Sequence, residues 1–184
     1  MHRARNTRRA RGRHTPPGVL ERLAEDRSAA VRAAVAGNPR APLDTLDSLA
    51  GDVVADVRVA VARNPSAPPE VLMALAGDED RSVRMAVARH PNTPPGALVL
   101  LASNCHWVAR TFVARHPNTP PGALATLAAD GHGCVRHAVA RHPSTPPEVL
   151  ARLAEDTEPH VRWAARRTPR TPPGVLPMLM AAAC

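Results

Sequence analysis

A 26-residue internal repeat constrains this chain more than any other feature of its sequence. Single prolines recur at a fixed interval of 26 residues, with no insertion between copies. They are Pro39, Pro65, Pro91, Pro117, Pro143 and Pro169. A period in the range of roughly 20–50 residues is typical of arrays in which each repeat packs on its neighbours. Counted from Thr15, the 184 residues hold six whole repeats and a final half repeat.

Leucines and Pro-Pro pairs follow the same register. The pair opens every repeat except the second, where it becomes Pro42-Leu43. One leucine column is Leu20, Leu46, Leu72, Leu98, Leu124, Leu150 and Leu176. A second column lies three residues later in each repeat, from Leu23 to Leu179. Spacing of three or four residues between apolar positions predicts a helix that buries one face.

The repeat that begins at Thr145 is representative, and its first part predicts a helix ending near Asp156. Thr145 is an N-cap candidate, Glu148 completes a capping box, and Pro146 takes the first helical position. The apolar stripe consists of Val149, Leu150, Leu153 and Ala154.

A second, shorter helix is predicted over about residues 159–167, and Pro169 ends it because a proline disfavours the α conformation of the residue before it. At this length the helix depends on packing by neighbouring repeats, and the sequence leaves open whether it is fully α-helical or partly 3₁₀. Val57, Val59 and Val61 alternate like a strand, but the position of Val59 varies between repeats, so alternation is not the shared pattern.

Composition supports an all-α class. Two Trp, one Phe and no Tyr are present, and Ile is missing, whereas sheets normally draw on these residues. No apolar run approaches the roughly 20 residues that span a bilayer. Cys105, Cys134 and Cys184 show no disulfide framework, so we expect a reducing, bacterial cytoplasm.

The net charge of +8 is unevenly distributed. All 24 basic residues are arginine, and six of them lie in residues 1–14, which hold no acid. The rest of the chain is therefore close to neutral. We interpret residues 1–14 as a disordered basic tail or a degenerate cap, and residues 15–184 as the repeat domain.

The repeat resembles the leucine-rich repeat variant (LRV) family. Residues 78–102 and 130–154 carry the pattern best, as Asp-x₄-Val-Arg-x₂-Val-Ala-x-His-Pro-x-Thr-Pro-Pro-x₂-Leu-x₂-Leu-Ala. The resemblance implies a right-handed superhelical solenoid of two-helix repeats, similar to HEAT and armadillo arrays. It also implies, for one relative, an iron–sulfur cluster held by a Cys-rich segment before the repeats. Residues 1–14 contain no Cys, so no cofactor is expected here.

An arginine column inside the repeats has an acid six residues before nearly every member. Arg is suited to such a site because its guanidinium bridges two acceptors. We therefore interpret the column as a structural ladder between repeats, in which Asp78 pairs with Arg84, with phosphate binding as the alternative. The ladder residues are Asp26, Arg32, Asp52, Arg58, Asp78, Arg84, Arg110, Asp130, Arg136, Asp156 and Arg162. Asn104 replaces the acid before Arg110.

Two further columns are candidates for binding. The first is Arg63, Arg89, Arg115, Arg141 and Arg167, at the predicted ends of the second helices, where cations complement the helix dipole or form a basic ridge. Each precedes an Asn, His or Thr that is expected to cap the last carbonyls. The second is a variable column, in which Met85, His137 and Trp163 form a recognition strip.

Cys105-His106 and His132-Gly133-Cys134 fall in adjacent turns, but their spacing is not that of a zinc finger, and turn residues are the simpler interpretation. Trp107 fills a packing gap or marks a contact surface. No P-loop, dinucleotide-binding or metalloprotease motif is present. We therefore expect a non-enzymatic scaffold for a protein partner. Nucleic-acid binding through the arginine ridge and the basic N-terminus is the first alternative, and a metal or iron–sulfur protein the second. No membrane or small-molecule partner is expected.

Overall fold

The structure is a computed structural model that describes residues 2–168, and the expected final half repeat lies outside these residues. The described part is helical throughout and contains no strand. Its helices are α1 (His2–Ala10), α2 (Pro17–Ala24), α3 (Ala29–Ala36), α4 (Leu43–Ala50), α5 (Ala55–Ala62), α6 (Pro69–Leu75), α7 (Arg81–Arg89), α8 (Pro95–Asn104), α9 (Trp107–Arg115), α10 (Pro121–Leu127), α11 (Gly133–Ala140), α12 (Pro147–Leu153) and α13 (Pro159–Arg167). The expected all-α solenoid of two-helix repeats is confirmed.

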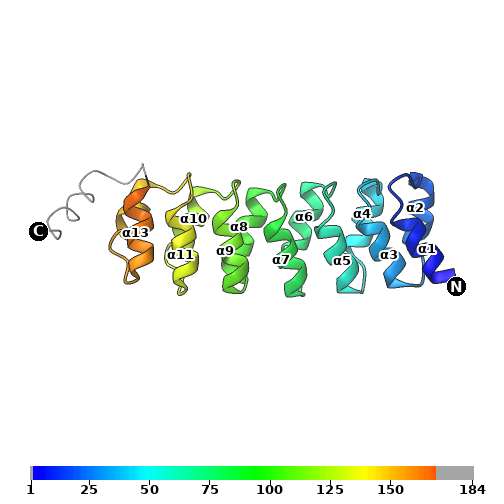
Figure 1. The fold of residues 1–184 in the computed structure, drawn as a ribbon, viewed down its shortest axis with the longest axis horizontal. Helices are drawn as coiled ribbons and strands as arrows, with labels where there is room; N and C mark the ends of the chain where they lie inside the picture. Colours follow the sequence, from blue (N-terminus) through cyan, green and yellow to red (C-terminus); the bar gives the residue numbers. More distant parts are fainter. Residues whose placement is uncertain (1, 169–184) are drawn as a thin grey trace, which may run out of the picture. The chain divides into compact units, whose positions relative to one another are not determined.

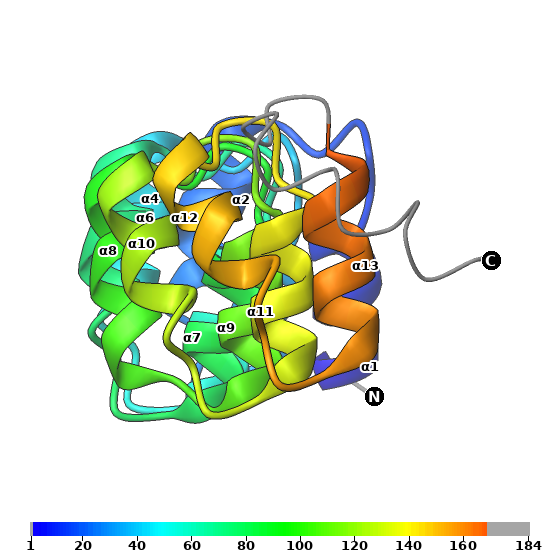
Figure 2. The same ribbon diagram turned by 90° about the vertical axis from the view of Figure 1, so that its left-hand side faces the viewer.

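The chain forms two compact units, the N-terminal unit (Met1–Ala97) and the C-terminal unit (Leu98–Cys184). In the N-terminal unit the first helices α2, α4 and α6 pack in series, and the second helices α3, α5 and α7 pack in a parallel series (Figure 1). In the C-terminal unit α9, α11 and α13 form the second-helix layer, and α10 and α12 cover one side of it (Figure 2).

The core lies between the two layers and is built from the repeated apolar columns. Within residues 2–168, each repeat supplies at least one fully buried leucine from its first helix and at least one fully buried valine from its second. In the N-terminal unit these residues include Leu20, Leu46, Leu72, Val31, Val57 and Val83. Small residues such as Ala36 and Ala62 are also fully buried, and they allow neighbouring second helices to approach closely. Val57, Val59 and Val61 belong to α5.

The second helices are α-helical, and no 3₁₀ segment occurs within residues 2–168, which decides between the two forms that the sequence leaves open. Eight or nine residues are marginal for an isolated helix, because nucleation costs more than a few hydrogen bonds return. Within each unit, however, second helices pack on neighbouring second helices, as α5 does on α3 and α7, and as α11 does on α9 and α13. Burial against these neighbours stabilises the full α-helical geometry.

The predicted capping box is also wrong. Helix α12 begins at Pro147, its N-cap is Pro146, and no side chain caps it. The hydroxyl of Thr145 instead donates to the carbonyl of Val139, six residues earlier in the chain, at 2.6 Å. Thr93 and Thr119 make the same bond to the residue six positions earlier, also at 2.6 Å. The threonine column therefore closes the end of the second helix rather than the start of the first.

Residues 2–10 form helix α1, which packs on α2 and α3 and extends the second-helix layer. Ala10 is fully buried, at the position that Ala36 occupies one repeat later. The amide nitrogen of Asn6 donates to the carboxylate of Asp26 at 2.9 Å. The segment expected to be a tail or a degenerate cap is thus a degenerate second helix. None of the helices within residues 2–168 has the length and apolar character needed to cross a membrane.

Candidate functional site

The Asp/Arg ladder joins successive repeats inside each unit. Arg58 binds both carboxylate oxygens of Asp78, 20 residues ahead, at 2.7 and 2.9 Å, and its third nitrogen donates to the carbonyl of Asp52 at 2.7 Å. Side-chain exposure at the Arg58–Asp78 contact is 10% and 8%. The same arrangement links Arg32 to Asp52, Arg110 to Asp130 and Arg136 to Asp156.

The pairing differs by one repeat from the one that the sequence predicts. Asp78 was expected to bind Arg84 in its own repeat, but its carboxylate binds Arg58 of the preceding repeat. Within residues 2–168, Arg84 donates to the backbone carbonyls of Asp78 and Glu79 instead. The reason is that each aspartate also accepts the backbone N–H two residues later, as Asp78 does from Asp80, which points the carboxylate towards the preceding repeat. Arg162 likewise donates to the carbonyl of Asp156.

Mutual hydrogen bonding lowers the pKa of the ladder aspartates. The guanidinium of Arg32 holds the pKa of Asp52 below its usual value, despite the opposing effect of burial. Arg136 has the same effect on the pKa of Asp156.

Arg84 lacks the aspartate partner that Arg32, Arg58, Arg110 and Arg136 have. The residue 20 positions after it is Asn104 instead of an aspartate, and the buried Nε of Arg84 has no hydrogen-bond partner within residues 2–168.

A second ladder, which the sequence interpretation missed, runs through the Asn and His that follow the second helices. Asn64 donates to the carbonyls of Ala36 and Asn38 in the preceding repeat, at 2.6 and 2.8 Å. His90 contacts the carbonyl of Asn64 through Nε2 at 2.9 Å, while its Nδ1 accepts the N–H of Asn92. A backbone N–H can only donate, so Nδ1 is unprotonated and Nε2 carries the proton.

His142 repeats this geometry on the carbonyl of His116, at 2.9 Å, and Thr168 donates to the carbonyl of Ala140, at 2.7 Å. These side chains were expected to cap their own helices, but the Asn and His side chains bind carbonyls at the end of the preceding repeat's helix. Thr168 does both, because it also donates to the carbonyl of Ala164 in its own helix, at 3.1 Å. The sequence does carry a signal for this ladder, because a polar residue with a side-chain donor recurs at the 26-residue interval after each second helix.

The arginine ridge and the variable column line the same grooves. In the N-terminal unit, a groove of about 330 Å³ between α5 and α7 is lined by Arg63, Met85 and Arg89, with Ala62, Ala86, His90 and Pro91. In the C-terminal unit, a groove of about 270 Å³ between α9 and α11 is lined by Arg115, His137 and Arg141. A third groove, of about 370 Å³, is lined by Arg141, Trp163 and Arg167. We call this surface of each unit the second-helix face.

The side chains of the second-helix face differ in their exposure to solvent. All five arginines of the ridge are exposed, at or directly after the last residue of their helices. Trp163 is 59% exposed, with the guanidinium of Arg167 4.9 Å from its ring centre. His137 is half-buried and contacts the carbonyl of His160, and Met85 is half-buried in its groove. The face therefore combines exposed cations with side chains that differ from repeat to repeat.

The cysteine and histidine turns do not form a metal centre within the described residues. Cys105 is buried, Cys134 is exposed, and no group of three or more His, Cys, Asp or Glu residues in positions 2–168 is arranged to hold an ion. Trp107 stacks on His132, with ring centres 4.9 Å apart. This contact joins adjacent turns in the C-terminal unit, which is the packing role considered for Trp107.

Stacked pairs of short helices, held by ladders one repeat apart, define an α-solenoid repeat protein. Profiles of two families match the chain: Leucine rich repeat variant at residues 29–53, 55–80 and 81–103, and Leucine Rich Repeat Variant domain at residues 109–169. The chain belongs to the leucine-rich repeat variant family.

A solved structure described as a leucine-rich repeat variant with a novel repetitive protein structural motif is similar to the whole fold. It is 29% identical, with a TM-score of 0.67, and the match covers 93% of this chain and 72% of that one. No curated protein matches the chain.

Proposed function

We propose that this protein is a non-enzymatic scaffold that binds an acidic segment of a protein partner on the second-helix face. One observation carries the proposal: a ridge arginine of one repeat lines the same groove as the variable residue of the next repeat, as Arg63 does with Met85. Repeat proteins bind partners through positions that their framework does not need. The framework here is the leucine and valine core with its two ladders.

The charge of the face favours an acidic partner. The guanidinium groups of Arg63, Arg115 and Arg141 make no ion pair or hydrogen bond within residues 2–168, unlike those of the Asp/Arg ladder. The other residues that line the three grooves are neutral or basic, and no carboxylate lines any of them. Exposed arginines in this arrangement are available for bidentate bonds to carboxylates. We propose a reducing, bacterial cytoplasm as the setting, and the exposed free thiol of Cys134 agrees with reducing conditions.

Nucleic acid is the second candidate, because α1 adds a separate group of cations. Arg3, Arg5, Arg8 and Arg9 are all exposed on this helix. Single-strand binding needs aromatic platforms, and Trp163 is the exposed large aromatic residue of the described part. A duplex, by contrast, needs only the cations.

Charge reversal on one face tests the proposal. We expect Arg115→Glu with Arg141→Glu to weaken binding of a fluorescein-labelled poly-glutamate peptide at least about tenfold, measured by fluorescence anisotropy. The matched control is Arg152→Glu on first helix α12, an exposed arginine outside these grooves, and it should leave binding unchanged.

A labelled DNA duplex is measured in parallel over a range of salt concentrations. Two results together would favour nucleic acid. The logarithm of duplex affinity would fall with the logarithm of salt concentration, with a slope of about −0.9 for each phosphate contacted, and duplex binding would be lost in the double variant. Equal peptide binding by the double variant and the Arg152 control would contradict the proposed use of this face.

A further inference from the structure

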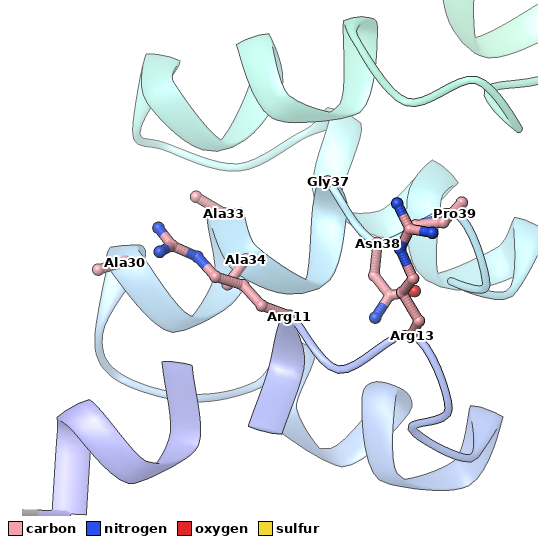
Figure 3. A pocket seen from close by; sticks show the side chains of 8 residues that line it. All are labelled: Arg11, Arg13, Ala30, Ala33, Ala34, Gly37, Asn38 and Pro39. Carbon is pink, nitrogen blue, oxygen red and sulfur yellow. The ribbon is translucent and has the colours of Figure 1, made fainter. Parts of the chain in front are cut away.

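The groove between α1 and α3 in the N-terminal unit is larger than its counterparts. Its volume is about 750 Å³, against about 330 Å³ for the groove in the same register between α5 and α7. Three small residues explain the larger volume. Ala30, Ala33 and Gly37 of this groove correspond to Ser82, Met85 and Arg89, which lie two repeats later in the chain. Ala33 and Gly37 leave open the space that the longer side chains of Met85 and Arg89 fill in the smaller groove. Figure 3 shows the lining of the larger groove.

The lining of this groove is apolar below and cationic at its rim. Ala30, Ala33 and Ala34 of α3 form the floor, and Arg11 and Arg13 approach from the end of α1 and the turn after it (Figure 3). Both arginines are exposed, and neither guanidinium makes an ion pair or hydrogen bond in the described part of the chain. No carboxylate lines the groove.

We propose that this groove binds one bulky apolar side chain, preferably aromatic, of an acidic peptide segment whose flanking carboxylates bind Arg11 and Arg13. The inference rests on the proposed function and specifies its partner. Charge complementarity argues for the acidic residues, since the rim is cationic throughout. The open apolar floor argues for a large anchor, because aromatic side chains in pockets with a polar rim supply most of the affinity of such contacts.

The chain itself supplies the variant that closes the groove. Ala33→Met with Gly37→Arg copies the residues found at Met85 and Arg89. Gly37 has φ of −81°, which is right-handed helical, and a Cβ there meets only the carbonyl oxygen of Ala33, at 3.5 Å. The variant should therefore keep the fold, which a circular dichroism melt checks.

The probes are two labelled peptides, Glu-Asp-Trp-Glu-Asp and Glu-Asp-Ala-Glu-Asp, measured by fluorescence anisotropy on the full chain. We expect the Trp peptide to bind the unmodified protein about tenfold tighter than the Ala peptide. Closing the groove should remove this preference. Arg11→Gln with Arg13→Gln should weaken both peptides and leave their ratio unchanged. The reciprocal variant, Met85→Ala with Arg89→Gly, opens the α5–α7 groove and should increase the preference.

Three results would overturn the inference: no binding of either peptide, equal affinity for both, or a preference that survives closing of the groove. Its failure is distinct from that of the proposed function. If Arg115→Glu with Arg141→Glu abolishes binding of the acidic probe while closing the α1–α3 groove has no effect, the face binds an acidic partner without this anchor. If a DNA duplex displaces the Trp peptide from the unmodified protein, the groove belongs to a nucleic-acid surface.

Discussion

At the scale of single residues, the ladder arginines differ in how many partners they hold. Arg58 is 8% exposed and satisfies two carboxylate oxygens and a carbonyl, whereas the Nε of Arg84 is buried without a partner in residues 2–168. Loss of one member of a buried pair leaves the other charge uncompensated, at about 3–5 kcal/mol. We expect Arg58→Ala to lower the free energy of unfolding by about 3 kcal/mol and Arg84→Ala by about 1 kcal/mol. Urea denaturation of both variants measures the difference, and equal losses would contradict it.

A second residue-scale prediction concerns acid sensitivity at His142. Burial lowers the pKa of His142 below its ordinary value of 6.5, and His116 lowers it further, against the opposing bond to the His116 carbonyl. The neutral ring is therefore favoured in the folded state. Its contribution is complete above about pH 6.5 and is lost as the pH falls from there towards the folded pKa.

Replacement by asparagine isolates this effect, because Asn64 makes the equivalent bond in its own repeat. Between pH 7 and pH 5, His142→Asn should lose roughly 1 kcal/mol less stability than the unmodified chain. The control is His14→Asn at an exposed position, which should follow the unmodified chain. Identical pH profiles for His142→Asn and the unmodified chain would show that this ring does not titrate differently on folding.

At the scale of elements, α1 stabilises the start of the array by covering α3. Asn38 donates to the carbonyls of Ala10 and Gly12 at 2.6 and 3.1 Å, in the manner of Asn64 one repeat later. Deletion of residues 1–14 should leave a folded protein whose melting temperature is several degrees lower, because the α3 surface becomes exposed. Replacing Arg3, Arg5, Arg8 and Arg9 by Gln should not do so. An unchanged melting temperature after deletion would mean that α1 is dispensable for packing.

At the scale of the whole molecule, the repeat permits removal of one complete copy. Deleting residues 41–66 places Asp78 20 positions after Arg32, so both ladders keep their register. We expect unchanged helicity per residue in far-UV circular dichroism, with lower stability and a smaller denaturant m-value, since less surface is buried. Deleting 20 residues instead of 26 breaks the register and should unfold the array. Equal behaviour of the two deletions would contradict nearest-neighbour stabilisation.

The sequence by itself determined the local features of this protein. The 26-residue period, the two helices of each repeat, the buried leucine column and the residues 159–167 of α13 all follow from spacing along one segment. These are predictable because helix periodicity and proline effects act within a few residues.

The tertiary structure decided which residues meet between repeats. The position of one repeat against the next sets whether Asp78 meets Arg58 or Arg84, and whether His142 reaches its own helix or the carbonyl of His116. That position results from packing of whole helix faces, and no local pattern encodes it. For the same reason, only the structure shows that an arginine of one repeat lines a groove with the variable residue of the next, as Arg63 does with Met85, and that Ala33 and Gly37 line a larger groove.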